Sequence, residues 1–318
     1  MLFARAIAAL AAAAALGAGA QYPQRNVTIV VPFTPGTGAD LIARILQPKL
    51  ADALKVAVIV DNKAGASGAI GTQAVADAPP DGYTLLFTAT SHGTLPATRH
   101  DLPYEPERSF TPVALTATSA MAFVVSPQLG VRTFADFVRL ARKKPGAMYY
   151  SSPGNGSIQH MTMELTKLES GMDIVHVPYK GSAGAATDLM GGRVQATVAA
   201  LQTMAPFVRS GKLEMLAVFS DARSPAFPDV PTMKQVGYPK LVVDTWYGLF
   251  APAGTPPQAV ERINHEVNAI LELPETRTVL AKQGLTPVVD RPERLGRLVH
   301  DELARWKHVV EQAKIEVK

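Results

Sequence analysis

Two kinds of hydrophobic pattern alternate along most of this chain. Short, largely apolar runs such as residues 27–31 predict buried strands. Stretches with apolar side chains three and four positions apart, such as residues 39–54, predict amphipathic helices. The alternation extends from Val27 to about Val289 and predicts βαβ units that form a mainly parallel sheet. Two such sets of units predict an α/β protein with two lobes.

The individual elements follow from the same periodicities. Pro48 lies inside the first predicted helix, so we expect that helix to bend or to end early. Thr133 with Asp136, and Thr255 with Gln258, have the spacing of a capping box and predict two helix starts. Further strands are predicted at 56–60, 83–87, 147–151, 174–177, 194–199 and 213–219, and further helices near 69–78, 158–168, 185–190, 260–271 and 295–310.

No low-complexity linker separates the two sets of units, so the chain must pass between the lobes within strands. The candidates for these crossing strands are residues 120–126 and 242–250. We therefore expect a signal peptide at 1–20, a first part of lobe 1 at 21–122, lobe 2 at 123–246, and a return to lobe 1 at 247–318.

The first twenty residues have the features of a secretory signal peptide. Arg5 supplies the positive end, an apolar stretch rich in Ala and Leu follows, and Ala18-Gly19-Ala20 gives the small-x-small cleavage pattern. The apolar stretch is too short to span a bilayer comfortably. We therefore expect export to the periplasm, with cleavage near Ala20.

Composition narrows the chemistry that the chain can perform. Its 318 residues include no cysteine, which excludes thiol catalysis, disulfides and cysteine-ligated metals. The formal net charge is +4, but Lys and Arg are dispersed among acidic residues, so we expect no nucleic-acid partner. The one short basic run, at 142–144, lies at a predicted helix end, where cations suit the helix dipole.

Four turns rich in small polar residues connect predicted strands to predicted helices. In an open α/β sheet such turns lie at the carboxyl ends of the strands, where ligands bind. Glycine lets the backbone approach a ligand closely, and a helix start offers free N–H groups to an anion. The four turns are residues 32–38, 88–93, 151–157 and 179–184. They predict a site for a small acidic ligand.

None of the four turns contains a motif for catalysis or for nucleotide binding. Elsewhere, residues 65–69 miss the nucleophile-elbow spacing because Ala69 stands where a glycine is needed. Gly154 and Gly156 lack the third glycine of a dinucleotide fingerprint, and no histidine spacing predicts a metal site. We expect no cofactor, no metal and no enzyme activity. The alternatives are an exported hydrolase or lyase acting on a small acid, and a ligand-sensing subunit of a signalling receptor.

Several short motifs follow one another in a characteristic order from about Tyr22 to the C-terminus. They are Val31-Pro32-Phe33 with residues 36–40, Asp61-Asn62-Lys63 with 65–71, and residues 80–85, 177–181, 188–192, 211–213, 223–225, 228–232, 246–248 and 251–256. Together they resemble the Bug family, the periplasmic solute-binding subunits of tripartite tricarboxylate transporters.

The resemblance implies a Venus-flytrap fold, in which two α/β lobes hinged by crossing strands enclose a cleft. It also implies a small carboxylate ligand, membrane permease subunits as partners and a monomeric chain. Family members often hold the carboxylate with backbone N–H groups, hydroxyls and waters instead of an arginine, which agrees with glycine turns at helix starts. The first turn departs from the family pattern, because Thr37 stands where glycine is more common. Aliphatic dicarboxylates, amino acids and aromatic acids all remain open as ligands.

The candidate ligand-binding residues lie in the four turns and where the chain crosses back. Phe33 could form a wall of the cleft or pack in the core, and the hydroxyl residues could cap helices instead of binding a ligand. Lys180 could be the counter-charge of a carboxylate or a solvated lysine, and Asp244 could accept a hydrogen bond from the ligand. The full set is Phe33, Thr34, Thr37, Gly38, Thr90, Ser91, Gly154, Asn155, Gly156, Ser157, Tyr179, Lys180, Gly181, Ala200, Asp244 and Thr245.

Overall fold

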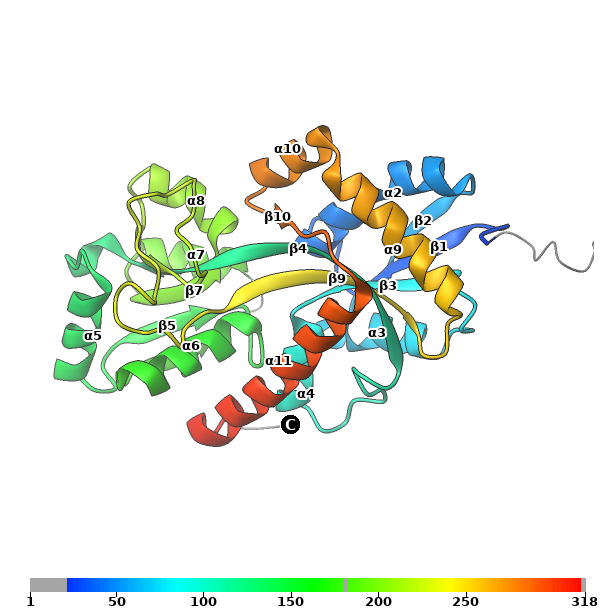
Figure 1. Cartoon of the computed structure of the whole chain (residues 1–318). Coiled ribbons are helices and arrows are strands. Elements are labelled where there is room, and N and C mark those ends of the chain that lie inside the picture. Colours follow the sequence, from blue (N-terminus) through cyan, green and yellow to red (C-terminus); the bar gives the residue numbers. More distant parts are fainter. Residues whose placement is uncertain (1–21, 180–181, 316–318) are drawn as a thin grey trace, which may run out of the picture.

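A computed structural model of the chain describes residues 22–179 and 182–315, which form two α/β lobes joined by long strands (Figure 1). The predicted signal peptide, together with Lys180 and Gly181, lies outside these described residues. The predicted two-lobed α/β architecture is confirmed. Within the described residues, no helix combines the length and the apolar character needed to cross a membrane.

Each lobe contains a parallel core of strands. In lobe 1, β1 (Val27–Val31) pairs in parallel with β2 (Val58–Asn62) and β3 (Thr84–Ala89). In lobe 2, β5 (Tyr149–Ser152) pairs in parallel with β6 (Val175–Pro178) and β7 (Ala196–Ala200). Parallel pairing requires helical crossovers, and these place helices over both faces of each sheet.

The long strands β4 (Phe110–Val125) and β9 (Asp244–Pro252) join the two lobes. They pair antiparallel with each other, from Phe110 opposite Pro252 to Ala120 opposite Asp244. Beyond Ala120, β4 pairs antiparallel with β7 and with β8 (Glu214–Val218) of lobe 2. The prediction of a mainly parallel sheet is therefore wrong for β4 and β9 and for the strands that pair with them across the lobes. The chain leaves lobe 1 along β4 and returns along β9 in the opposite direction.

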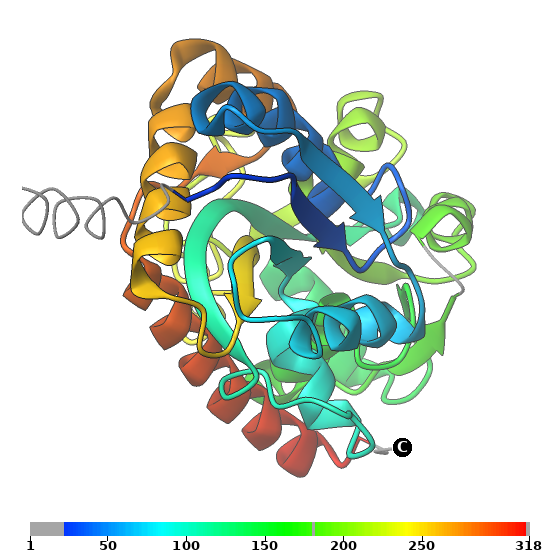
Figure 2. The same ribbon diagram turned by 90° about the vertical axis from the view of Figure 1, so that its right-hand side faces the viewer.

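Helices cover both faces of the sheet in each lobe (Figures 1 and 2). Lobe 1 carries α2 (Gly38–Leu54), α9 (Pro257–Glu272) and α10 (Pro274–Lys282) on one face, and α3 (Ala69–Ala76) and α4 (Ser91–Thr98) on the other. Lobe 2 carries α5 (Phe134–Lys143) and α6 (Ile158–Ser170) on one face, and α7 (Ser182–Met190) and α8 (Leu201–Arg209) on the other. Short pieces complete the fold, namely η1 (Ala66–Gly68), η2 (Pro127–Leu129) and β10 (Thr286–Pro287).

The local signals for helix starts and stops succeed in part. The Thr133 hydroxyl accepts a hydrogen bond from the Asp136 N–H at 3.1 Å and caps α5, so the first predicted helix start is confirmed. The second is also confirmed, because α9 starts at Pro257, but Thr255 does not cap it: Pro256 is the N-cap, and the Thr255 hydroxyl donates to the Pro252 carbonyl at 2.7 Å. An early stop at Pro48 is also wrong, because the buried side chains of Leu50 and Leu54 keep α2 packed on lobe 1 to its end.

The last helix, α11 (Pro292–Ala313), is a third connection between the lobes that the strand patterns did not predict (Figure 1). Its N-terminal half packs Leu295 and Val299 into the core of lobe 1. Its C-terminal half packs Trp306 and Val310 into the core of lobe 2. Between them the buried carboxylate of Glu302 accepts a hydrogen bond from the Trp306 Nε1–H at 2.7 Å.

We predict that Trp306→Ala lowers the free energy of unfolding by about 3–5 kcal/mol, because it leaves a cavity and removes the Nε1–H donor from the buried Glu302 carboxyl. Urea denaturation followed by circular dichroism measures the change. Lys307→Ala, which changes the adjacent exposed position, should shift the free energy by less than about 0.5 kcal/mol. Equal losses in the two variants would show that α11 is not anchored through Trp306.

Candidate functional site

The first predicted turn lies between β1 and α2 and is held by a buried carboxylate. Asp40 accepts hydrogen bonds from the Gly36 N–H, the Arg44 Nε–H and the Asn62 amide, each at 2.9 Å. The Asn62 amide also donates to the Phe33 carbonyl at 3.1 Å. Burial alone would raise the pKa of Asp40, but these donors outweigh it and lower that pKa below its ordinary value. Asp40 therefore shapes the turn and is not free to meet a ligand.

The start of α2 is open. Its N-cap, Thr37, makes no side-chain cap, because the Thr37 hydroxyl donates to the Thr34 carbonyl at 3.1 Å. Within the described residues, no protein acceptor lies within hydrogen-bond distance of the N–H groups of Gly38, Ala39 and Asp40. Such N–H groups at the positive end of a 17-residue helix form an anion site.

Tyr247 stands beside this helix start. The residue lies on β9, and a Cβ atom added to Gly38 would overlap its hydroxyl. Only glycine at position 38 therefore allows this close approach. The ring of Tyr247 is buried, and burial raises its pKa to about 12, so the phenol stays a hydrogen-bond donor at neutral pH. Periodicity did not single out Tyr247, because a tyrosine in a strand more often packs in the core.

Phe33 packs against a second turn, residues 65–68, that sequence reasoning also missed. The Phe33 ring lies beside Gly68. In this turn Ala66 and Ser67 both have positive φ, at 47° and 57°. Two consecutive non-glycine residues in this region are strained, and such strain concentrates at functional sites. Positive φ at these two residues cannot be read from periodicity, which is why the turn was predicted only as a helix start.

The turn between β3 and α4 is held mainly by hydrogen bonds to β9. The Thr90 hydroxyl accepts from the Trp246 N–H at 2.8 Å and faces the Trp246 carbonyl at 3.4 Å, which ties lobe 1 to β9. Ser91 is half-buried at the first position of α4. His92 is buried among Tyr104 and other aromatic rings, where its ring packs as an apolar group. Burial lowers the pKa of His92 to about 4.

A cavity of about 440 Å³ is shared by the two lobes. Lobe 2 contributes two of the predicted residues, Asn155 and Gly156. Lobe 1 contributes residues that sequence reasoning missed, namely Ser67, Leu95, Thr98, Arg99 and Asp101. The guanidinium of Arg99 is occupied by Asp101, with Nε–Oδ1 at 2.8 Å and Nη2–Oδ2 at 2.6 Å. This pair lies close in sequence, and nothing in the local pattern marked it as part of an interlobe surface.

In the turn between β5 and α6, the glycine N–H groups already donate hydrogen bonds to acceptors within lobe 2. The Gly154 N–H donates to Ser152 Oγ at 3.2 Å, and the Gly156 N–H donates to His160 Nδ1 at 3.2 Å. The Ser157 hydroxyl donates to the Gly154 carbonyl at 2.7 Å and also caps α6 by accepting from the His160 N–H. In this conformation, the N–H groups of both glycines are therefore already taken up by acceptors of lobe 2. Asn155 is exposed, and Gly156 is buried against Thr98 of lobe 1.

The remaining lobe 2 candidates line a different part of the surface. The Tyr179 hydroxyl donates to Asp188 at 2.7 Å, and Asp188 also pairs with Arg193. Tyr179 is therefore bonded within its own lobe. Ala200 lines a small cavity of about 50 Å³. Its other walls are Pro153, Gln159, Ala185, Ala186, Thr197, Val198, Ala199, Thr203 and Met204.

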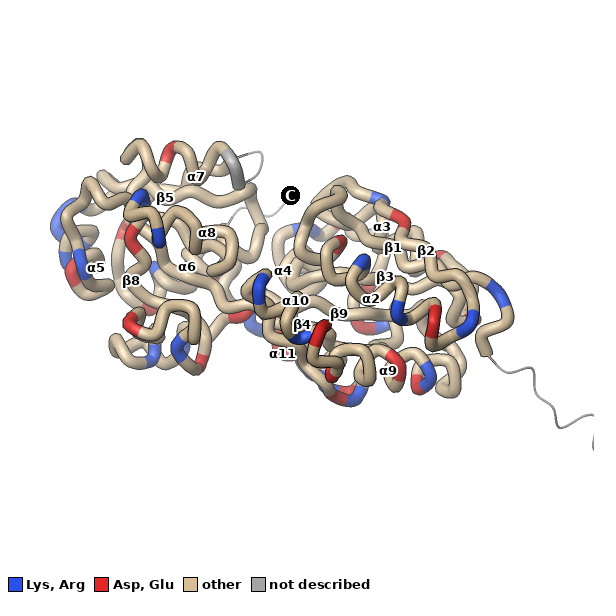
Figure 3. The backbone as a smooth tube through the Cα atoms, turned by 90° about the horizontal axis from the view of Figure 1, so that it is seen from above, with Lys and Arg blue, Asp and Glu red and all other residues tan. Residues whose placement is uncertain are grey.

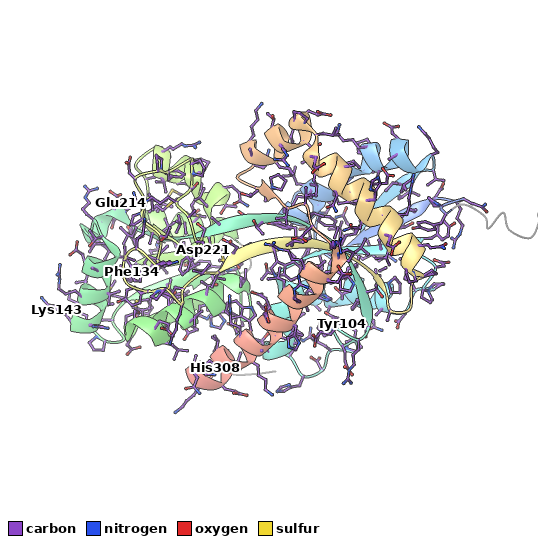
Figure 4. The ribbon with its side chains drawn as sticks, viewed as in Figure 1. Tyr104, Phe134, Lys143, Glu214, Asp221 and His308 are labelled. Atoms are coloured by element: carbon purple, nitrogen blue, oxygen red, sulfur yellow. The ribbon has the colours of Figure 1, made fainter. Side chains whose placement is uncertain are left out.

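Asp244 and Thr245 lie at the lobe 2 end of β9, where the chain returns to lobe 1. The Asp244 carboxyl has one buried oxygen without a hydrogen-bond partner. Burial, with a smaller contribution from the nearby Asp221 charge, raises the pKa of Asp244 to about 6. Asp221 is labelled in Figure 4 beside the lobe 2 end of the crossing strands. Thr245 is buried on the same strand.

Charges are spread over both lobes, with acidic and basic residues interspersed (Figure 3). Among residues 22–179 and 182–315, no three His, Asp or Glu side chains gather closely enough to hold a metal ion. The described site thus consists of backbone N–H groups, hydroxyls and the paired Arg99.

Two α/β lobes, three connections between them and a shared cavity define the class of bilobal solute-binding proteins. The family model of the tripartite tricarboxylate transporter family receptor matches residues 42–315. The chain belongs to this family, and the predicted resemblance is confirmed. Solved members of the family are periplasmic binding proteins.

Three relatives illustrate the similarity. The chain is 35% identical to protein BugT of Bordetella pertussis over 303 residues, covering 93% of this chain and 92% of BugT. It is 34% identical to Rpa4515 of R. palustris, solved with adipate, with a TM-score of 0.82 over 92% of this chain and 99% of that one. It is 32% identical to MatC of Rhodopseudomonas palustris, solved with bound malate, with a TM-score of 0.77 over 91% of this chain and 100% of that one.

We predict that Gly156→Ala pushes the lobes apart. Gly156 has φ of +72°, and an added Cβ would lie 2.5 Å from Thr98 Oγ1. The radius of gyration from small-angle scattering should rise, and unfolding should become easier by more than the roughly 1–2 kcal/mol that positive φ alone costs. Gly130→Ala is the control, because Gly130 has φ of +65° and nothing within 4 Å of an added Cβ. If both variants behave alike, the two lobes do not press together at Gly156.

We predict that Asp244→Asn stabilises the protein at pH 7.5 but not at pH 4. The folded state raises the pKa of Asp244 to about 6, so it disfavours the ionised form, and stability is lost as pH rises from about 3.8 to 6. Asparagine cannot ionise, and the gain at pH 7.5 should reach at most about 3 kcal/mol. Urea titrations at the two pH values measure it. Asp221→Asn should give a smaller gain in the same direction, and a gain that is equal at both pH values would contradict the assignment.

Proposed function

We propose that this chain is a periplasmic solute-binding protein that captures a small carboxylate between its lobes and delivers it to the membrane permease subunits of a tripartite transporter. The observation that carries the proposal is the open start of α2, where unpaired N–H groups and the Tyr247 hydroxyl stand together. Membership of the receptor family supports the same role.

The chemistry of this helix start suits a carboxylate. The N–H groups of Gly38, Ala39 and Asp40 lie at the positive end of the α2 dipole, and Tyr247 adds a hydroxyl donor. Hydrogen bonds to an ionised carboxylate are charge-assisted and roughly twice as strong as neutral ones. They replace the water that the anion loses on burial, so no arginine is needed.

The rest of the carboxylate site is inferred from the same geometry. Phe33 forms the apolar wall beside the open helix start, and Thr34, Thr37, Ser91 and Thr245 supply hydroxyls near it. From lobe 2, Asn155 and Ser157 reach the ligand when the lobes approach, and Lys180, next to Tyr179, assists as a counter-charge. Adipate and malate in two relatives make dicarboxylates the first class to test.

Several further parts of the function are proposals of the same kind. We infer that the mature chain begins near residue 21, acts as a monomer and performs no chemistry on its ligand. We also infer that the lobes divide at 122/123 and 246/247, within β4 and β9. Closure of the lobes on the ligand follows from a site whose donors come from both of them.

Ser152 and His176 resemble a nucleophile with its base, but their surroundings disfavour a hydrolase. Ser152 Oγ lies 2.7 Å from His176 Nε2. Ser152 is fully buried, however, and its hydroxyl is already bonded to the Gly154 backbone. A substrate carbonyl therefore cannot approach Ser152 Oγ, and the pair supports the turn instead.

We predict that titration calorimetry with adipate and L-malate at pH 7.5 shows saturable binding without turnover. Tyr247→Phe should weaken that binding about tenfold or more, because it removes a hydrogen bond to a charged group. Tyr238→Phe, on the outer part of lobe 2, is the matched control and should bind as the parent does. Unchanged affinity in Tyr247→Phe would place the carboxylate elsewhere, and absence of binding across a wider panel of carboxylic acids would refute the proposed function.

A further inference from the structure

Two histidines, the buried His160 and the half-buried His176, lie directly behind the lobe 2 turn, Gly154–Ser157. His160 is in the first turn of α6, and His176 is on β6. Their rings stack with centroids 4.0 Å apart and planes inclined by 12°. Tyr150 of β5 continues the stack at 4.8 Å from the His176 ring. Neither histidine is used by the carboxylate site described above.

Each histidine bonds to one end of the turn. His160 Nδ1 accepts the Gly156 N–H at 3.2 Å, which requires a neutral ring with its proton on Nε2. His176 Nε2 lies 2.7 Å from Ser152 Oγ, and that oxygen accepts the Gly154 N–H at 3.2 Å. The two imidazoles therefore hold both glycines of the turn through a short chain of hydrogen bonds.

The charged groups that face this pair favour neutral rings. Glu164 of α6 accepts hydrogen bonds from the Tyr150 hydroxyl at 2.5 Å and from Lys167 Nζ at 2.9 Å, so its charge is already balanced. Burial and the Lys167 charge lower the pKa of His160 to about 4. Burial, His160 and Lys167 together outweigh the attraction of Glu164 and lower the pKa of His176 to about 4.

We propose that His160 and His176 are positioning residues that hold the Gly154–Ser157 turn in its binding conformation, and that protonation of His160 releases the turn and weakens ligand capture in acid. The effect on the ligand rests on the proposed function; the effect on the turn does not. A protonated Nδ1 of His160 cannot accept the Gly156 N–H, and two imidazolium rings cannot stay stacked at 4.0 Å.

The sign of the effect follows from proton linkage. The closed turn keeps both rings neutral, whereas a ring freed by opening the turn has an ordinary pKa near 6.5. As pH falls from about 6.5 toward 4, opening takes up a proton at His160 and becomes easier by up to about tenfold per pH unit. Above pH 7 the turn should show no such dependence.

Amide hydrogen exchange of Gly156 tests, without any ligand, whether the histidines keep the turn closed. The exchange is followed by NMR and corrected for its intrinsic pH dependence. In the parent protein the opening should increase as pH falls below about 6.5. His160→Asn keeps an acceptor oxygen near the position of Nδ1 but does not titrate, so the Gly156 amide should stay protected, with a weaker dependence on pH. His265→Asn, on the exposed face of α9, is the matched control and should behave as the parent. If His160→Asn keeps the full pH dependence of the parent, the proposal is wrong.

Calorimetry with adipate at pH 7.5 and pH 5 tests the consequence for binding. Adipate itself takes up protons in this range, but it does so equally for every variant, so the comparison is between proteins. The parent and His265→Asn should lose more affinity in acid than His160→Asn does, by up to about tenfold per pH unit below 6.5. Equal losses in all three would overturn the link to ligand capture. If adipate binds none of them at pH 7.5, the ligand proposal fails, while the exchange experiment still decides whether the histidines hold the turn.

Discussion

The antiparallel pairing of β4 with β9 is the constraint on which the rest of this structure depends. Nine residue pairs run from Phe110 opposite Pro252 to Ala120 opposite Asp244, and β4 then continues into the sheet of lobe 2. Because this ladder fixes the direction of the sheet on both sides, it also fixes where the parallel strands of each lobe end. Strand-to-helix turns of both lobes thereby come to the interlobe surface, where the Gly156 turn meets Thr98.

The turns that reach this surface differ in how many of their backbone N–H groups have a hydrogen-bond acceptor within the protein. In lobe 2, the N–H groups of Gly154, Gly156 and Ser157 all have acceptors within the turn or in α6. In lobe 1, the buried carboxylate of Asp40 organises the turn but leaves the first N–H groups of α2 open. Only N–H groups without a protein acceptor can offset the free energy that an anion loses when it leaves water. On the function proposed above, lobe 1 therefore provides the anchor for the carboxylate, and the lobe 2 turn approaches it.

Much of this fold follows from periodicity, because the long helices bury an apolar stripe and the central strands bury nearly continuous runs. The stripe from Val260 to Leu271 and the strand Val27–Val31 lie where predicted. What could not be predicted depends on contacts between distant segments. Tyr247 reaches Gly38 only because β9 lies beside β3, and Arg99 lines a shared cavity only because two lobes meet there. The strained Ala66 and Ser67 carry no sequence signal, since neither is a residue that favours positive φ.

Motion between the lobes is limited by α11 as well as by the strands. Both halves of this helix are buried in different cores, through Val299 in lobe 1 and Trp306 in lobe 2, so neither lobe can rotate without bending or shifting it. The turn of helix between them holds Glu302, whose pKa is raised by burial and whose carboxyl accepts from Trp306. On the opposite side, Gln202 of α8 packs against Gly284 of lobe 1 and accepts from Ser119 of β4. A ligand can favour closure only by the difference in its affinity for the two states. Since three connections resist large rotations, a small displacement that brings the lobe 2 turn to the start of α2 is the change that a carboxylate could select.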